Sequence, residues 1–301
     1  MAQLTQAARP TTLDRPISIV SWLSRKNRAY YLLGYVLLIL LSAWTIFPFY
    51  WQIATSVRLD VDLYRPSVTL VPQALTLEHY AKVLTGTSSQ FPIQFRNSLY
   101  VGLGTTLVAV VFGSMGAYAL TRLRFFARAG LARILVYAYL APASVLFIPL
   151  FMLMNSLNLR DNLLGLALTH LTFSVPFATW MLMGYFKTLP IELEEAALVD
   201  GAGRLTTLWR IVMPLSAPAI VVVAVFTFTL SWNEFLYALV LIQAKENMTV
   251  PVGLTAYVVA DVFYWGQMMA AATIMSLPPL LLYFFGQRWV IAGWTAGAVK
   301  N

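Results

Sequence analysis

The chain has 301 residues, of which 59% are hydrophobic and 11% are charged, and its mean hydropathy is +0.73. Soluble domains are usually about 45–50% apolar, so this composition excludes an ordinary soluble protein and predicts a membrane protein. The formal net charge of +8 then reflects how basic residues are distributed across a membrane rather than an affinity for nucleic acid. Because the chain has no cysteine, disulfides and thiol chemistry are excluded.

Residues 1–30 carry charge but no apolar core of their own, so we expect a cytoplasmic tail rather than a cleaved signal peptide. Six apolar stretches follow, each long enough to cross a hydrocarbon core of about 30 Å as a helix. They lie near residues 31–51, 98–120, 132–154, 163–185, 213–242 and 268–290. Gly113 and Ala117, four residues apart on the second stretch, predict a close approach of two helices. We therefore expect an all-α membrane protein with six transmembrane helices over residues 31–301.

The basic residues predict the orientation of these helices, because Lys and Arg accumulate on the cytoplasmic side. If the N-terminus is inside, the inner segments hold 14 of the 20 Lys and Arg residues. Both termini are therefore predicted to be cytoplasmic. Two sizeable segments, 52–97 and 243–267, are then the outer segments, and residues 186–212 form an inner loop.

The inner loop gathers four of the chain's twelve acidic residues within nine positions: Glu192, Glu194, Glu195 and Asp200. Pro190 suits a first helical turn, and Gly201 suits the left-handed residue that ends a helix, so a helix is predicted over about 190–200. A second, amphipathic helix that ends at Pro214 is predicted from apolar residues at helical spacing, which are Leu205, Leu208, Trp209 and Val212. From these residues alone, a helix that enters a groove on a soluble protein and a solvated acidic loop both remain open.

The spacing of the inner loop resembles a family motif. It reads Glu195-Ala196-Ala197, three residues, Gly201, nine residues, and then Ile211, Val212, Met213 and Pro214. This resembles the EAA loop of ABC importer permeases, in which the position of Met213 is usually Leu, a volume-conserving difference. Together with "SWNEFLYAL" at 231–239 and "GWTAGAVK" at 293–300, it resembles the carbohydrate-uptake branch and subunits similar to the G subunit of the maltose permease. The resemblance covers about residue 30 to the end.

This resemblance implies a multi-subunit importer in the bacterial cytoplasmic membrane. The implied partners are membrane lipid, a second permease subunit similar to the maltose-permease F subunit, two ATP-binding subunits and an extracytoplasmic sugar-binding protein. The chain has no G-x-x-x-x-G-K-[S/T] phosphate loop, so ATP and Mg²⁺ are expected on the partner ATPase subunits, with no cofactor and no catalytic residue in this chain.

The resemblance also assigns roles within the inner loop, which becomes a cytoplasmic helix-turn-helix coupling loop. Glu195 is expected to pair with a basic residue of an ATPase groove. Ala196 and Ala197 allow close approach, Gly201 sets the turn, and Asp200 stabilises that turn. Ile211 and Pro214 complete the motif.

Polar residues within apolar stretches form a second candidate site. Trp232, Asn233 and Glu234 are expected in the outer half of the fifth stretch, where they could line a sugar path. Alternatively, Glu234 pairs with a polar group on a neighbouring helix, as intramembrane charges commonly do. His170 is expected to be a hydrogen-bonded packing residue, and no metal site is predicted because no Cys or second His accompanies it. The outer segment 243–267 either contacts the binding protein, as in maltose-type G subunits, or only connects two helices.

Two other function classes compete with the permease. A proton-coupled secondary carrier would use Glu234 and Asp261, but it leaves the 195–214 pattern unexplained. A membrane-embedded hydrolase would use His170 with a serine, but the chain has no nucleophile motif such as G-x-S-x-G. The sequence therefore predicts a non-enzymatic permease subunit of an ATP-driven importer for a sugar or oligosaccharide.

Overall fold

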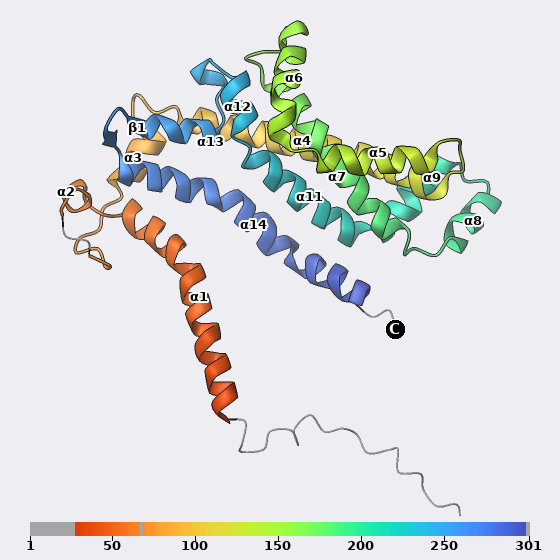
Figure 1. The fold of residues 1–301 in the computed structure, drawn as a ribbon, viewed down its shortest axis with the longest axis horizontal. Coiled ribbons are helices and arrows are strands. Elements are labelled where there is room, and N and C mark those ends of the chain that lie inside the picture. The colour runs from red at the N-terminus through yellow and green to blue at the C-terminus, as the bar shows by residue number, and fades with distance from the viewer. Residues whose placement is uncertain (1–27, 67–68, 299–301) are drawn as a thin grey trace, which may run out of the picture. The chain divides into compact units, whose positions relative to one another are not determined.

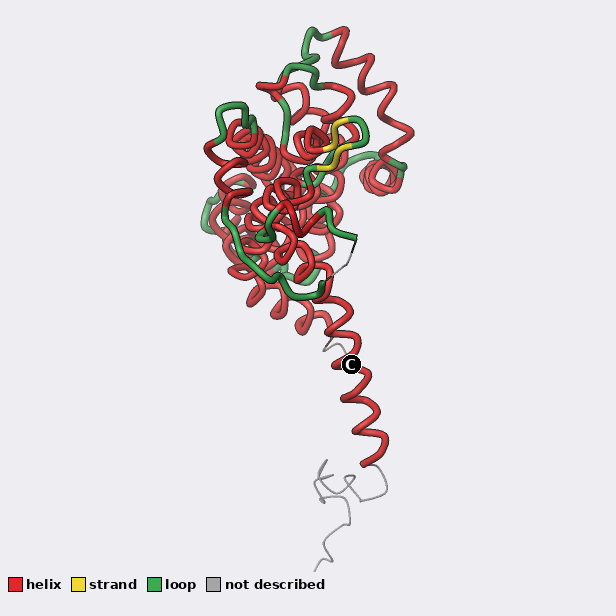
Figure 2. The backbone as a smooth tube through the Cα atoms, turned by 90° about the vertical axis from the view of Figure 1, so that its left-hand side faces the viewer, coloured by secondary structure: helices red, strands yellow, loops and turns green. Residues whose placement is uncertain are grey.

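The computed structural model describes residues 28–66 and 69–298 and is helical along most of this length (Figure 1). The predicted tail up to residue 27 and the basic Lys300 lie outside the described residues. In chain order the elements are α1 (Arg28–Ser56), α2 (Asp60–Leu63), α3 (Glu78–Thr85), α4 (Phe91–Arg122), α5 (Arg128–Leu140), α6 (Ala143–Ser156), α7 (Leu163–Phe186), α8 (Glu192–Val199), α9 (Arg204–Thr207), η3 (Leu208–Val212), α10 (Met213–Leu215), α11 (Ala217–Trp232), α12 (Leu236–Leu241), η4 (Lys245–Asn247), α13 (Val250–Gly253), η5 (Leu254–Tyr257), β1 (Val258–Val259), β2 (Val262–Phe263) and α14 (Trp265–Ala298). The strands β1 and β2 form a small antiparallel hairpin, drawn in yellow in Figure 2.

The chain divides into two compact units, residues 1–51 and 52–301. The described part of the first unit is the long apolar stretch of α1, in which every residue from Tyr30 to Tyr50 is exposed. Burying apolar surface away from water stabilises a protein by about 25 cal/mol per Å². A helix with this much exposed apolar surface therefore belongs in lipid or against another membrane protein.

Three helices form the core of the second unit. Helix α4 packs along α7, and α11 lies against both. A Cβ atom built at Gly113 of α4 would lie only 2.7 Å from Cβ of Ala178 on α7, so glycine is what permits this approach. Ala117, one turn further along α4, is completely buried. The close helix approach predicted from Gly113 and Ala117 is confirmed.

The described residues contain four helices long and apolar enough to cross a membrane, and six spans if each of two bent helix pairs counts as one. The apolar stretch 132–154 is not a straight helix, because the chain breaks between α5 and α6 at Ala141 and Pro142. A proline lacks a backbone N–H and disfavours helical geometry in the residue before it.

The fifth apolar stretch, 213–242, also differs from a single helix. The helical segment Arg204–Leu215 meets Ala217–Trp232 at an angle of 84°. The break falls at Ser216, between Pro214 and Pro218. Helix α11 then ends at Trp232, and the chain resumes a helix only at Leu236. The stretch 213–242 is therefore interrupted twice, at Ser216 between two prolines and again between Trp232 and Leu236.

The first half of segment 243–267, which is predicted to lie outside, is fixed to the helical core. The Asp161 carboxylate, in the turn before α7, accepts hydrogen bonds from the backbone N–H groups of Gln243 and Ala244 at 3.0 and 2.9 Å. Asn97 of α4 donates its side-chain amide to the carbonyls of Glu246 and Met248 at 2.7 and 3.0 Å. These bonds leave the hairpin β1–β2 as the projecting part of the segment.

Candidate functional site

One face of helix α8 is exposed and carries part of the acidic cluster. Glu192, Glu195, Ala196 and Val199 are all exposed, and their spacing of i, i+3, i+4 and i+7 places them on one side of the helix. Val199 is 87% exposed although it is apolar. Three glutamates in the first turn complement the positive end of the helix dipole. The result is a narrow, acidic helix face with small apolar side chains that no described residue covers.

Gly201 ends this helix in the left-handed conformation, with φ of +83°. Its N–H donates to the carbonyl of Leu198 at 3.1 Å, and the N–H of Ala202 donates to the carbonyl of Ala197 at 2.9 Å. This pair of bonds is the Schellman arrangement, which favours glycine at the left-handed position. The predicted left-handed glycine is confirmed. Both closing bonds are backbone bonds, so the Asp200 side chain takes no part in them.

The remaining predicted coupling residues divide between exposed and covered positions. Ala196 is exposed, but Ala197 is only 8% exposed and faces the chain itself. Pro214 is exposed at the start of α10, whereas Ile211 is half-buried. Of the two alanines, therefore, only Ala196 can meet a partner directly.

Glu194 points the opposite way from Glu195 and forms a buried ion pair. Its Oε1 lies 2.7 Å from Nε of Arg122, the last residue of α4, and the two side chains are 4% and 9% exposed. Arg122 also donates from Nη2 to the carbonyls of Phe186 and Leu189, each at 2.8 Å. One guanidinium thus joins the end of α4, the end of α7 and the start of α8.

The sequence reading counted Glu194 among the acids of the exposed cluster and missed this pair. A signal for it was present in the helical period. Glu194 shares its face with Ala197 and Leu198, opposite Glu195, and a charge on the covered face of a helix requires a partner. The period indicates that Glu194 has a partner but does not single out Arg122 among the basic residues of the predicted inner segments.

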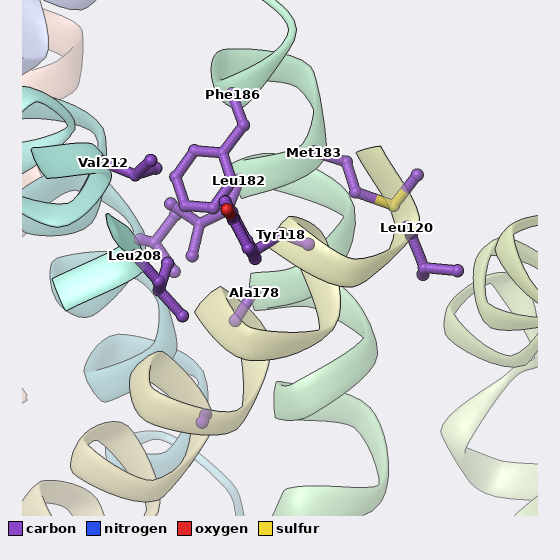
Figure 3. Packing of buried hydrophobic residues seen from close by; sticks show 11 residues of the cluster. Tyr118, Leu120, Ala178, Leu182, Met183, Phe186, Leu208 and Val212 are labelled. Carbon is purple, nitrogen blue, oxygen red and sulfur yellow. The ribbon is translucent and has the colours of Figure 1, made fainter. Parts of the chain in front are cut away.

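The second half of the loop is anchored by packing. Leu208 and Val212 are each 1% exposed and lie among Tyr118, Leu182 and Phe186, as Figure 3 shows. The other two residues of the predicted apolar stripe do not follow them, since Leu205 is 61% and Trp209 is 42% exposed. The predicted second helix is confirmed, since the chain is helical over Arg204–Leu215, but only Leu208 and Val212 of its apolar stripe are buried within the chain. The segment Leu208–Val212 is a π-helical turn, which departs from the period of 3.6 residues on which the prediction rested.

The three predicted path residues lie in different environments. Trp232 is 1% exposed, donates from Nε1 to the carbonyl of Met275 at 3.1 Å, and packs against the rings of Phe228 and Phe95. Asn233 is exposed, and its amide donates to the carbonyl of Thr229 in its own helix at 3.0 Å. Asn233 is thus the only one of the three that is exposed.

Glu234 is engaged at both carboxylate oxygens. Oε1 accepts a hydrogen bond from the N–H of Tyr237 at 2.8 Å, and Oε2 accepts one from the N–H of Ala238 at 3.1 Å. Oε2 also lies 3.3 Å from Nε2 of His170 on α7. The carboxylate therefore begins helix α12 and ties it to α7, which is the packing role that the sequence left open for it.

His170 completes a buried row of polar side chains. Its Nδ1 lies 2.7 Å from Oγ of Ser231, while Nε2 faces Glu234. The order serine, histidine, carboxylate resembles a hydrolase triad, but His170 is 1% and Ser231 5% exposed, so a substrate has no access to the serine. Both ring nitrogens are occupied, as expected for a hydrogen-bonded packing residue.

Asp261, the other acid of the carrier hypothesis, lies elsewhere in the fold. It is exposed at the tip of the hairpin β1–β2, next to Ala260, whose φ is +50°. It therefore belongs to the connection between α13 and α14 and not to a long apolar helix.

Comparison with known proteins identifies the family. Residues 109–295 match the family described as "Binding-protein-dependent transport system inner membrane component". The chain is 38% identical to the inner membrane ABC transporter permease protein YcjP of Escherichia coli, over 85% of this chain and 92% of that protein. It is 33% identical to the trehalose/maltose transport system permease protein MalG of Thermococcus litoralis, over 87% and 94% of the two chains.

A solved structure shows the same fold. A chain from the crystal structure of a bacterial ABC transporter involved in the import of the acidic polysaccharide alginate aligns with a TM-score of 0.75 and 24% identity, over 88% of this chain and 98% of that chain. The predicted importer-permease fold is therefore confirmed. The chain belongs to the family of binding-protein-dependent transport system inner membrane components.

Proposed function

We propose that this chain is a membrane-spanning permease subunit of an ATP-driven, binding-protein-dependent importer of a sugar or oligosaccharide. The observation that carries the proposal is the exposed acidic face of α8, set by the Gly201 turn and joined to the ends of α4 and α7. The sugar class is supported by the MalG relative and by the diacetylchitobiose uptake system permease protein DasC of Streptomyces coelicolor, which is 33% identical over 85% of this chain and 92% of that protein.

In this proposal, energy enters through the exposed face of α8. Glu195 pairs with a basic residue in the groove of an ATP-binding subunit, and Ala196 allows the close approach. Because Arg122 joins α8 to α4 and α7, a displacement of α8 also moves the ends of the helices that form the core. ATP and Mg²⁺ are bound by two partner subunits, and this chain is not itself an enzyme.

The partner surfaces follow from what the chain leaves exposed. The apolar side chains of α1 suit membrane lipid and a second permease subunit similar to the maltose-permease F subunit. The hairpin β1–β2 exposes Val258, Val259, Val262 and Phe263, which suits contact with an extracytoplasmic binding protein. The excess of Lys and Arg in the predicted inner segments supports an orientation with both termini in the cytoplasm of a bacterial cell.

For the sugar path, Asn233 is the residue that we expect to meet the substrate. Its exposed amide can donate to and accept from hydroxyl groups. Trp232 and Glu234 then hold the end of α11 and the start of α12 in place, because their polar atoms are bonded within the chain.

Reconstituted transport tests this function. The chain is assembled in proteoliposomes with its second permease, its ATP-binding subunits and its binding protein, and sugar uptake is measured. Uptake is expected to require ATP on the cytoplasmic side and the binding protein on the other, and Asp261→Asn is expected to leave the ATP dependence unchanged. Uptake that persists without ATP and follows a pH gradient would contradict the proposal.

A further inference from the structure

A cavity of about 570 Å³ lies where the two outer segments meet. Its walls come from the turn between α3 and α4, the first turn of α4, residues 245–257 and the start of α14. We call it the outer cavity. It is separate from α8 and from the residues Trp232, Asn233 and Glu234.

Gln94 of α4 lines the outer cavity with its side-chain amide. The residue is only 5% exposed, and its side chain makes no hydrogen bond to any other group in the described part of the chain. A primary amide carries two N–H donors and a carbonyl acceptor. Buried polar groups are normally hydrogen-bonded, so an amide left open towards a cavity points to a ligand there.

The position of this amide is built into the fold. A Cβ atom on Gly253 of α13 would overlap the Gln94 side-chain amide, so only glycine leaves the amide its place. The wall that carries Gly253 is fixed as well. Ser98 Oγ accepts a hydrogen bond from the N–H of Val250 at 2.8 Å, and Asn97 donates to the carbonyl of Met248 at 3.0 Å. The cavity is therefore largely preformed, as small-molecule sites usually are.

The remaining lining groups include Lys82 and Lys245, and several of the others suit a hydroxyl-rich ring. Tyr257 and Tyr264, joined by a backbone hydrogen bond of 2.9 Å at the base of the hairpin β1–β2, bring aromatic rings with polar hydroxyl ends. Gln90 and Gln267 add two more amides. Amides and hydroxyls can bond the alternating donors and acceptors of a sugar, while the tyrosine rings cover its apolar C–H face.

We propose that the outer cavity is a sugar subsite, in which Gln94 donates to and accepts from hydroxyl groups of the transported sugar. The proposal rests on the proposed function. The cavity lies beside the hairpin β1–β2, which we propose contacts the binding protein. A sugar released by the binding protein could therefore bind here before it passes further along the transport path.

Sugar binding to the assembled transporter tests the subsite. The full complex in lipid nanodiscs, without binding protein, is titrated with trehalose, maltose and diacetylchitobiose and observed by saturation-transfer NMR. Gln94→Leu keeps the approximate size of the side chain and breaks no bond within the described chain. Gly253→Ala displaces the Gln94 amide. Gln243→Leu, an exposed glutamine of the same outer segment, is the matched control.

We expect saturation transfer to the sugar that the wild-type complex transports, and about tenfold weaker binding in Gln94→Leu and Gly253→Ala, as for a lost ligand hydrogen bond. The Gln243→Leu complex is expected to bind like wild type. Equal binding in all four complexes overturns the subsite but leaves the proposed function standing. Loss of binding-protein affinity in Gln94→Leu with sugar binding intact also overturns it, since the cavity would then hold a protein segment. A wild-type complex that transports none of the three sugars with its binding protein and ATP refutes the sugar class and the subsite together.

Discussion

Breaking the buried Arg122–Glu194 pair should loosen α8 from the core and lower the yield of transport per ATP hydrolysed. The charged atoms approach to 2.7 Å and both side chains are at least nine-tenths buried. Charges about 4 Å apart attract by about 4 kcal/mol at an effective dielectric of about 20. Removal of one partner from a buried pair typically costs about 3–5 kcal/mol, because it leaves the other charge uncompensated.

A double-mutant cycle separates the pair from the packing around it. Glu194→Met leaves the guanidinium without its carboxylate, and Arg122→Met leaves a buried carboxylate and also removes the bonds to the carbonyls of Phe186 and Leu189. Apolar replacement of both partners is often close to neutral. The double variant should therefore be less destabilised than the sum of the two single variants by about 2–3 kcal/mol, within the range found for residues in contact.

The assay has two readouts on the reconstituted complex. Thermal unfolding in detergent measures stability, and the ratio of sugar taken up to ATP hydrolysed measures coupling. Glu192→Met is the matched control, because Glu192 lies on the same helix but is exposed. If Glu194→Met and Glu192→Met behave alike in both readouts, the Arg122–Glu194 pair contributes neither to stability nor to coupling. That result would refute the reasoning from burial.

Four further outcomes are expected. Glu195→Lys should weaken binding of the ATP-binding subunits by several kcal/mol, because it places like charges at a desolvated interface, and this should lower their co-purification. Glu192→Lys should destabilise the helix by only about 0.3–1 kcal/mol through the helix dipole. An equal loss of co-purification in Glu195→Lys and Glu192→Lys would contradict a specific role for Glu195. Gly201→Val should uncouple ATP hydrolysis from uptake more than it weakens assembly, since a β-branched residue resists the φ of +83°; unchanged coupling would count against the turn as a fixed element. Glu234→Gln should lower transport while leaving assembly and basal ATP hydrolysis intact, if the carboxylate positions the path; unchanged uptake kinetics, or lost assembly, would leave it a packing role alone. Burial raises the pKa of Asp161, but the backbone N–H donors to its carboxylate outweigh this and hold the pKa below 3.8. Its contribution to stability should therefore be complete above about pH 3.8 and be lost as the pH falls through the lowered pKa. The unfolding temperature, measured against pH, should show this loss in the wild-type chain and not in Asp161→Asn.

The chemistry that the sequence could predict was local. A left-handed glycine after an acidic helix follows from backbone preference alone, and Gly201 occupies that conformation. Close packing at Gly113 follows from the absence of a side chain. Pro142 and Pro218 predict bends, but the sequence did not show that the helices end there, because hydropathy averages over a window and does not register a single interruption of the backbone ladder.

Long-range partners could not be read from the sequence, because they depend on which helix faces bring residues together. Arg122 and Glu194 are 72 positions apart, and no local pattern pairs them. The same holds for His170 and Glu234, since a polar residue in an apolar stretch indicates that a partner exists but not which one.

The two kinds of acid in α8 explain why one short loop holds so many of them. Glu195 and Glu192 lie on the face that is open to a partner, and Glu194 lies on the face that Arg122 covers. A helix that docks into a separate subunit, as we propose for α8, and also stays attached to its own core needs polar contacts on both sides, because an attachment on one side alone would let it move without moving the core. The Schellman turn at Gly201 then fixes its angle to the segment that carries Leu208 and Val212. The acidic cluster is thus two oppositely directed sets of contacts on one helix, and a displacement imposed on the outward set reaches the inward set through eight residues of rigid backbone.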